Sequence, residues 1–257
     1  MNGFKGFFGL LLLAFVLPLP AVAQDGARGM LTITFDDASR SQYEHGLRIA
    51  EDLGMVGTLF VISGPTDAAQ RDPYSWVINW RQVRDFRDAG WEIGAHSDTH
   101  PYMTEISTAE VIRELDVSRE AIEENVGIRP VTFATPYGDN NPETVDLIME
   151  RFSYHVLAFG GSEGRNVPET TDPAMISRMD VDWETPPEIY CDEMRSAAAN
   201  GIWLVLMFHQ FTEDDPEPWV QAVDDYEAVM SCAAELRDAG ELEIVTVRDA
   251  MAVIERQ

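Results

Sequence analysis

The sequence has very few basic residues and almost no lysine. Lys5 is its single lysine, and 18 Lys and Arg stand against 45 Asp and Glu, so the formal net charge is -27. This negative charge argues against nucleic acid or an anionic lipid surface as a partner, because both carry charge of the same sign. It would be compatible with a cationic amino-sugar product, but a surface tuned for solubility is the favoured explanation.

Cysteine is scarce as well. Cys191 and Cys232 are the two in the chain, and neither lies at a spacing typical of metal sites, so we expect no cysteine-based metal centre. In an oxidising compartment the two could form one disulfide. Two buried thiols are the equal alternative, since the sequence does not give the Cα separation that a disulfide requires.

Long hydrophobic runs are absent except at the N-terminus. Lys5 precedes the apolar segment 7–16, and Ala21-Val22-Ala23 has the small-x-small pattern of a cleavage site. We therefore expect a signal peptide at 1–23 and a secreted or periplasmic protein, with a retained anchor as the alternative. The remaining residues, 24–257, suit one α/β domain, and no later run approaches the length of a transmembrane helix.

Short β-rich runs alternate with helical segments over the rest of the chain. This alternation predicts repeated βα units around a parallel sheet or barrel. We expect strands at 30–35, 57–62, 91–93, 131–134, 154–159, 202–208 and 243–247. We expect helices at 39–53, 80–89, 107–125, 142–151 and 219–238.

Two histidines and two aspartates lie at the ends of predicted strands. His96 and His100 are four residues apart, and neutral imidazoles at that spacing can reach one cation. Asp36 and Asp37 end another β-rich run, and in a parallel α/β barrel such strand ends converge on one face. The pattern favours a His-His-Asp metal site with a spare carboxylate. The alternatives are helix capping by Asp37 and two loop histidines without a ligand.

Other polar residues also follow predicted strands. His209 ends the apolar run 203–208 and suits a general acid, with a satisfied core histidine as the equal alternative. Pro136 and Tyr137 lie in a rigid turn that could aim a backbone N–H at a reacting oxygen, or could simply connect a strand to a helix. Asp98, between the paired histidines, could be a turn residue or could orient an imidazole.

These motifs resemble those of the polysaccharide deacetylases of the NodB-homology type, a family of carbohydrate esterases. Residues 34–37 match the family's first motif, and 96–100 match its second, His-Ser/Thr-x-x-His. Residues 133–138 and 207–209 are similar, less specifically, to the third and the last motif. The likeness spans roughly residue 30 to the C-terminus.

The resemblance implies a distorted (β/α) barrel of about seven units with a parallel-strand core and one divalent metal. By position, Asp37, His96 and His100 would be the metal ligands. Zinc is the first expectation, with cobalt, nickel or manganese as alternatives.

The resemblance also assigns roles in catalysis and substrate binding. Asp36 would be the general base that activates water, His209 would be the general acid that protonates the leaving amine, and the backbone N–H of Tyr137 would hold the oxyanion. Pro136 and Tyr137 would contact the substrate. Trp183 follows Asp182 in a pair similar to the fourth motif, and it would line an acetyl or sugar pocket or pack in the fold.

The chain departs from the family in its third motif. Many members have an arginine there that pairs with the catalytic aspartate, and this chain has Ala134 at that place. We hypothesise that Arg178, in the β-like run 177–183, approaches Asp36 from a neighbouring strand and supplies the missing cation.

The resemblance implies a metal-dependent hydrolase acting on an extracellular or cell-envelope polysaccharide or oligosaccharide. It would remove N-acetyl groups, with O-acetyl groups as the second choice. Two alternatives stay open: a catalytically weak carbohydrate-binding relative, which the absent arginine favours, and a deacylase of a small amide. We expect a monomer whose partner is the acetylated sugar, with no nucleic acid and no stable membrane insertion after signal cleavage.

Overall fold

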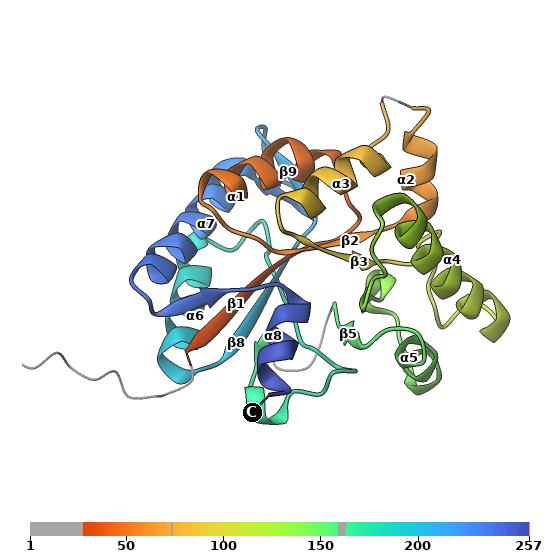
Figure 1. The fold of residues 1–257 in the computed structure, drawn as a ribbon. Coiled ribbons are helices and arrows are strands. Elements are labelled where there is room, and N and C mark those ends of the chain that lie inside the picture. Colours follow the sequence, from red (N-terminus) through yellow and green to blue (C-terminus); the bar gives the residue numbers. More distant parts are fainter. Residues whose placement is uncertain (1–27, 73, 159–162, 257) are drawn as a thin grey trace, which may run out of the picture.

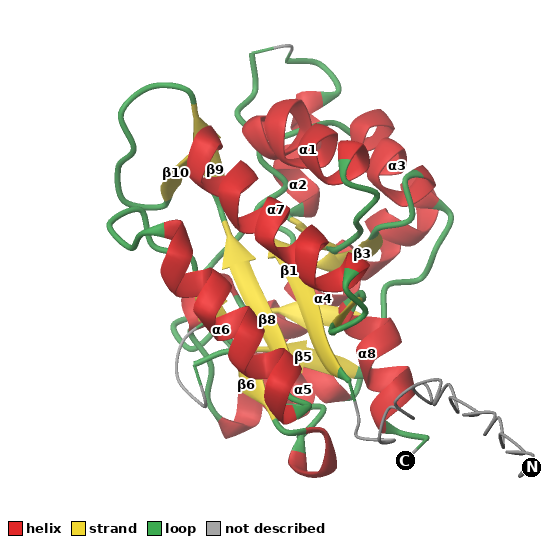
Figure 2. Ribbon diagram, turned by 90° about the vertical axis from the view of Figure 1, so that its left-hand side faces the viewer, coloured by secondary structure: helices red, strands yellow, loops and turns green. Residues whose placement is uncertain are grey.

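The computed structural model describes residues 28–72, 74–158 and 163–256, and these form a mixed α/β fold (Figure 1). A curled sheet runs through the centre, and helices surround it (Figure 2). The signal peptide expected at 1–23 lies outside the described residues. Within the described residues, no helix combines the length and the apolar character that crossing a membrane requires.

Parallel strands form the centre of the sheet. They are β1 (Gly29–Phe35), β2 (Thr58–Val61), β3 (Glu92–Ala95), β4 (Thr132–Ala134), β5 (Tyr154–Val156) and β8 (Trp203–Phe208). Their order is β5-β4-β3-β2-β1-β8. β1 pairs with β8 in register from Met30 opposite Trp203 to Phe35 opposite Phe208. Every residue of these two strands is buried, as expected for parallel strands covered on both faces.

The two sides of the sheet approach each other through the segment that contains β7 (Met179–Asp180). β7 pairs with β8 in parallel, and Ile176, just before it, forms a parallel bridge with Val156 of β5. β6 (Arg165–Asn166) adds an antiparallel pair to β8, and β11 (Leu242–Ile244) lies beside the first half of β1. The predicted distorted barrel with a parallel core is confirmed.

Helices and short turns occupy the connections between the strands. The helices are α1 (Arg48–Asp52), α2 (Ser63–Ala69), α3 (Trp80–Asp88), α4 (Thr108–Val126), α5 (Pro142–Met149), α6 (Pro187–Asn200), α7 (Val223–Asp238) and α8 (Val247–Ile254). A π-helical turn covers Gln42–Leu47, and 3₁₀ turns cover Pro136–Gly138 and Pro168–Thr170. β9 (Gln210–Thr212) and β10 (Val220–Ala222) form a separate parallel pair.

Apolar side chains form two buried clusters, one on each face of the curled sheet. The larger cluster includes Ile33 and Phe35 and lies between the sheet and the surrounding helices. In the smaller one, Phe60 and Val205 pack together with Met251 and other residues of α8. That cluster also contains residues at the amino ends of β1 and β8, so α8 covers the end of the sheet where these strands begin. The carboxyl ends of the strands are left for other contacts.

The predicted elements differ from the structure mainly in the last third of the chain. The strand expected at 243–247 ends at Ile244, because the Thr246 side chain accepts a hydrogen bond from the N–H of Asp249 and caps α8. The helix expected at 219–238 begins only at Val223, since the residues before it pair with β9. The strand expected at 154–159 ends at Val156, and its last residue lies outside the described part. Helices α2, α6 and α8 are not anticipated from the sequence.

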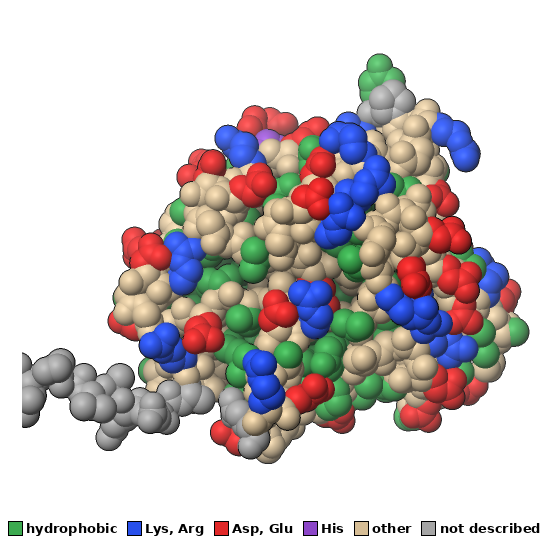
Figure 3. All heavy atoms as spheres, viewed as in Figure 1, with side chains coloured by type: hydrophobic (Ala, Val, Ile, Leu, Met, Phe, Trp, Pro, Cys, Tyr) green, Lys and Arg blue, Asp and Glu red, His purple; other side chains and the backbone are tan. Residues whose placement is uncertain are grey.

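The two cysteines form a disulfide that joins neighbouring helices. Cys191 of α6 and Cys232 of α7 have Cα atoms 5.9 Å apart, within the usual range for a disulfide. Of the two alternatives that the sequence leaves open, the structure shows the disulfide rather than two thiols. On the surface shown in Figure 3, acidic and basic side chains are interspersed, so the negative charge of the chain is not gathered there into one patch.

Candidate metal centre and active site

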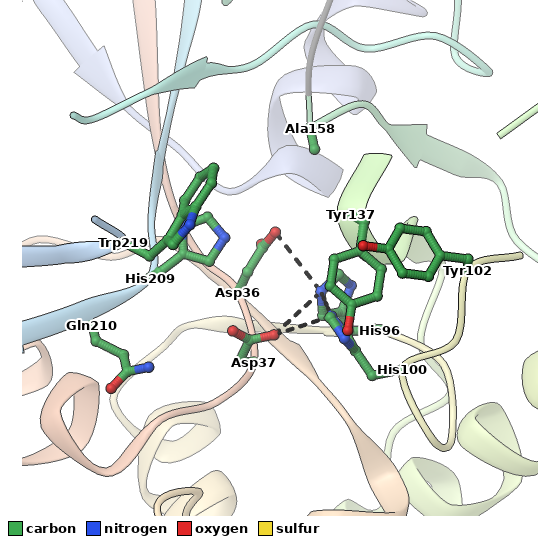
Figure 4. A pocket seen from close by; sticks show the side chains of 10 residues that line it. All are labelled: Asp36, Asp37, His96, His100, Tyr102, Tyr137, Ala158, His209, Gln210 and Trp219. Carbon is green, nitrogen blue, oxygen red and sulfur yellow. Dashed lines mark hydrogen bonds and ion pairs between the residues drawn. The ribbon is translucent and has the colours of Figure 1, made fainter. Parts of the chain in front are cut away.

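The carboxyl ends of β1, β3 and β8 meet at one cavity of about 560 Å³ (Figure 4). Its ionisable side chains include five from the segments that follow these strands: Asp36, Asp37, His96, His100 and His209. The remaining lining residues are Tyr102, Tyr137, Ala158, Gln210 and Trp219. The sequence predicted the convergence of the first group. Parallel strands begin at one end of the sheet and end at the other, so loops distant in sequence share this rim.

Asp37, His96 and His100 form a compact cluster of possible metal ligands. The Oδ1 atom of Asp37 lies 3.5 Å from Nε2 of His96 and 3.4 Å from Nε2 of His100, and the two Nε2 atoms are 3.2 Å apart. Separations of about 3.3 Å are those of ligands around a tetrahedral ion with bonds of about 2.0 Å. The Oδ1 atom of Asp37 is buried and has no hydrogen-bond partner among the described residues. The donor set therefore fits a divalent cation.

Backbone contacts orient both imidazoles toward this cluster. Nδ1 of His96 lies 2.8 Å from the carbonyl oxygen of Ala134, so Nδ1 donates to that oxygen and Nε2 faces the cluster. The backbone N–H of His100 donates to Oγ of Ser97 at 3.0 Å. The φ angles of Asp37, Ser97 and His100 are 73°, 63° and 61°, a left-handed conformation that residues other than glycine seldom adopt. Such strain is typical of sites where the surrounding structure fixes the backbone for function.

The two imidazoles have pKa values shifted in opposite directions. Burial lowers the pKa of His96, but the neighbouring carboxylates of Asp36 and Asp37 more than offset this and raise it. Burial and the adjacent His96 lower the pKa of His100 to about 4. His100 is therefore neutral at pH 7, which is the form that binds a metal.

Asp36 forms a buried, bidentate ion pair with Arg178. The two guanidinium nitrogens donate to Oδ1 at 2.6 Å and to Oδ2 at 2.9 Å, and both side chains are almost inaccessible to water. Nε of the same arginine donates to the carbonyl oxygen of Leu157, and this bond fixes the orientation of the guanidinium group. Burial raises the pKa of Asp36, but the charge of Arg178 outweighs it and holds the pKa far below its usual value. The contact expected from the sequence is present, and Asp36 is ionised.

His209 lies on the opposite side of Asp36 and Asp37 from His96 and His100 (Figure 4). Its Nδ1 is 4.0 Å from Oδ1 of Asp180 on β7, and its ring contacts Trp219 at a centroid distance of 5.1 Å. Burial raises the pKa of Asp180, with the charge of His209 acting in the opposite direction. The imidazole thus faces a carboxylate on one side and an indole on the other.

Gln42 connects the ends of β1 and β8, a role that no sequence pattern indicated. Its buried side-chain amide donates to the carbonyl oxygen of Asp36 at 2.7 Å and to the carbonyl oxygen of His209. Its Oε1 accepts from the N–H of Ser39 at 2.8 Å. Gln42 belongs to the π-helical turn that follows β1, an irregularity often found at functional sites. One amide thus fixes the two strand ends that carry the site's carboxylates and His209.

Glu114 of α4 supports the loop that carries the paired histidines. Its Oε2 accepts from the N–H groups of Asp98 and Thr99 at 2.9 and 2.7 Å, and its Oε1 accepts from the Thr99 hydroxyl at 2.8 Å. The Asp98 carboxylate binds Ser63 and Arg113. Of its two predicted roles, the structure supports a turn residue, and the bracing of the loop comes from Glu114.

Two predicted substrate contacts do not line the cavity. Pro136 is buried beneath the turn that presents Tyr137, and Trp183 lies half-buried in the turn after β7. Tyr102 and Trp219 do line it, and the sequence did not single them out. Tyr102 could have been predicted to line the cavity, because it follows His100 and Pro101 directly in the sequence. Trp219 lay inside an expected helix, which concealed it.

Comparison with known sequences places this α/β barrel and its strand-end cluster in one family. The sequence model described as "Polysaccharide deacetylase" matches residues 23–156. The chain belongs to the polysaccharide deacetylase family, as the motifs indicated.

Several curated proteins are similar to this chain. It is 26% identical over 166 residues to the uncharacterized protein YlxY of Bacillus subtilis, covering 64% of this chain and 46% of that protein. It is 27% identical over 131 residues to the peptidoglycan-N-acetylglucosamine deacetylase PgdA of Listeria monocytogenes, covering 51% of this chain and 26% of that one. The chain thus spans less than half the length of these relatives.

Solved structures share the fold across most of the chain. The peptidoglycan deacetylase PdaC from Bacillus subtilis superposes with a TM-score of 0.54 at 19% identity, covering 89% of this chain and 93% of that one. A pseudoenzyme of carbohydrate esterase family 4 from Bacillus anthracis gives a TM-score of 0.55 at 18% identity, covering 87% and 66%. These likenesses define the fold alone.

Proposed function

We propose that this protein is a metal-dependent deacetylase that hydrolyses N-acetyl groups on an acetylated polysaccharide or oligosaccharide. The cluster of Asp37, His96 and His100, with the unpartnered Oδ1 atom of Asp37, is the observation that carries the proposal. Three protein ligands leave coordination positions for water and substrate, which distinguishes catalytic from structural zinc sites. Family membership and the names of PgdA and PdaC support the same reaction class.

Asp37, His96 and His100 would hold the cation, with zinc as our first choice. When bound, it would act as a Lewis acid on the acetyl carbonyl and lower the pKa of water. Asp36 accepts the proton of the attacking water, because its carboxylate is ionised and lies beside the cluster, with Oδ2 3.9 Å from Nε2 of His96. Arg178 fixes the orientation of that carboxylate through two hydrogen bonds.

The opposite side of the cavity completes the hydrolysis. His209, which faces Asp180, donates a proton to the amine as the C–N bond breaks. The products are acetate and the free amine. The backbone N–H of Tyr137 stabilises the oxyanion that forms in between. Its φ of 56° places this residue in a strained turn beside His100, as expected for a backbone held in a functional orientation.

We further propose that the protein is exported after removal of residues 1–23. The pattern of Lys5, the apolar segment 7–16 and Ala21-Val22-Ala23 supports this, and so does the disulfide between α6 and α7, because disulfides persist in oxidising compartments. The acetylated polymer would then be part of the cell envelope or its surroundings. We also propose that the protein is a monomer.

The test is acetate release from a panel of acetylated polymers. Purified wild-type protein is incubated with chitin oligomers, poly-N-acetylglucosamine, peptidoglycan and acetylxylan, with Asp36→Asn as the matched control that removes the base. We expect release from an N-acetylated polymer by the wild type and none by the variant. Release from none of the panel, with binding retained, would instead support the carbohydrate-binding relative.

A further inference from the structure

Three exposed aromatic side chains surround the cavity. Tyr102, Tyr137 and Trp219 have 47%, 48% and 52% of their surface exposed, and all three line the cavity. Exposed aromatic surface in a cavity contributes little to folding and is typical of ligand-binding grooves. Tyr74, by contrast, is 93% exposed and does not line this cavity, so it serves as a control residue below.

The aromatic residues form two walls with the reacting groups between them (Figure 4). On one side Tyr102 and Tyr137 are stacked, with ring centroids 4.1 Å apart and an interplanar angle of 14°, and the ring of Tyr137 contacts His100. On the other side Trp219 packs against His209. Asp36 and Asp37 lie between these walls. A ligand whose acetamide reaches the centre therefore has an aromatic surface on both sides.

The backbone of Trp219 is held in a strained conformation. Its φ is 68°, a conformation that is a genuine outlier for a bulky residue. The carbonyl oxygen of Trp219 accepts from the N–H of Gln210 at 3.0 Å, and the next residue begins β10, which pairs with β9. Seven described non-glycine residues have positive φ, and four of them, Trp219 included, line the cavity. Strain of this kind persists only where surrounding contacts enforce it.

We propose that Tyr102 and Trp219 each stack against one sugar ring on either side of the acetamide that is hydrolysed. The C–H face of a hexose packs on an aromatic ring while its hydroxyl groups stay in water. The substrate is then a linear chain of at least three N-acetylhexosamine units, and the protein acts on an internal unit. Trp219 takes the place that the sequence suggested for Trp183. This inference rests on the proposed deacetylase function.

Binding and turnover of chitopentaose and of monomeric N-acetylglucosamine test the inference. Binding is measured by calorimetry with Asp36→Asn, and turnover by acetate release with the wild type. We expect the pentamer to bind at least about tenfold more tightly than the monomer, as two added stacking contacts would give. Mass spectrometry of partly deacetylated pentamer should show that internal units lose acetate before both end units.

Variants separate stacking from a general loss of structure. Tyr102→Ala and Trp219→Ala should each raise KM for the pentamer about five- to tenfold, a loss of roughly 1 kcal/mol of stacking, with a smaller effect on kcat. Tyr102→Phe and Trp219→Phe should restore most of the loss, and Tyr74→Ala should match the wild type.

Equal binding of monomer and pentamer, or an unchanged KM in both alanine variants, would overturn the inference even if acetate is released. Absence of acetate release together with pentamer-selective binding would instead overturn the deacetylase function and leave the two aromatic walls supported. The two failures are therefore distinguishable.

Discussion

At the scale of single residues, one ion pair defines the state of the proposed base. Asp36 and Arg178 are 142 positions apart and yet form two hydrogen bonds in an environment that excludes water. Removing one partner of such a pair leaves an uncompensated buried charge. Arg178 thereby places a cation beside Asp36, which Ala134 in the third motif cannot do.

Arg178→Ala should lower kcat by about 10²-fold or more while metal content stays at the wild-type level. The carboxylate of Asp36 would lose both orienting hydrogen bonds. The side chain of Arg178 donates to Leu157, Thr34 and Asp36, and none of these is a proposed metal ligand. Acetate release and metal analysis of the same preparation measure this. Arg178→Lys keeps the positive charge but cannot form the bidentate pair, so its kcat should lie between those of the wild type and Arg178→Ala. Wild-type turnover in the alanine variant would show that the pair is only structural.

At the scale of elements, Glu114 of α4 does not line the cavity but braces the loop that carries His96 and His100. Glu114→Gln should weaken metal binding about 10- to 100-fold, because an amide cannot accept all the hydrogen bonds from Asp98 and Thr99 that the carboxylate accepts. Metal affinity is measured by competition with a chelating dye. Glu120→Gln, an exposed position on the same helix, is the matched control. Equal affinity in the two variants would contradict the bracing role.

The strand β5 carries a buried histidine that should make stability depend on pH. His155 lies 2.7 Å from Oγ1 of Thr135 and 2.8 Å from the carbonyl oxygen of Ala174, and burial lowers its pKa to about 4. The unfolded chain, with a pKa near 6.5, binds this proton first as the pH falls. The stabilisation is thus complete above about pH 6.5 and is lost progressively toward pH 4.

We therefore expect the free energy of unfolding to fall by about 2 kcal/mol between pH 7.5 and pH 5 from His155 alone. Urea unfolding at both pH values measures it. His155→Gln, which cannot be protonated, should show a pH dependence smaller by that amount. An identical pH dependence in the two proteins would mean that His155 is not buried in its neutral form.

Sequence patterns identified the residues of the candidate site better than the residues that hold them in place. Asp36, Asp37, His96 and His100 are adjacent or nearly so, and each pair ends an apolar run, so local pattern was enough to find them. Gln42, Glu114 and Trp219 act through tertiary contacts, and nothing in their local sequence shows which strand end or loop they will reach. Helix α8 is missed for a different reason: the strand expected at 243–247 includes its first residue, Val247, and only seven residues of the helix follow.

At the scale of the whole molecule, the disulfide joins two helices on the outside of the sheet. It closes a loop of 41 residues between α6 and α7. A cross-link that closes a loop of this length lowers the entropy of the unfolded chain and so raises the free energy of unfolding by about 4 kcal/mol. On the face shown in Figure 3, the interspersed exposed charges have no comparable effect on stability, because each exposed ion pair contributes little.

Replacing both cysteines should therefore lower the free energy of unfolding by about 2–4 kcal/mol. Urea unfolding of Cys191→Ser/Cys232→Ser and of the wild type, each with and without a reducing agent, gives the value. Reductant should destabilise the wild type and leave the variant unaffected. A wild type that is indifferent to full reduction would show that the cross-link is not stabilising.

The central claim is that a divalent ion held by Asp37, His96 and His100 is required for deacetylation. The most direct measurement is acetate release from chitopentaose by protein stripped with a chelator, dialysed and reloaded with zinc, together with the metal content at each stage. We predict about one ion per chain before stripping, loss of activity with the metal, and recovery on reloading, with neither metal nor activity in His96→Ala. Full activity in metal-free protein would contradict the account.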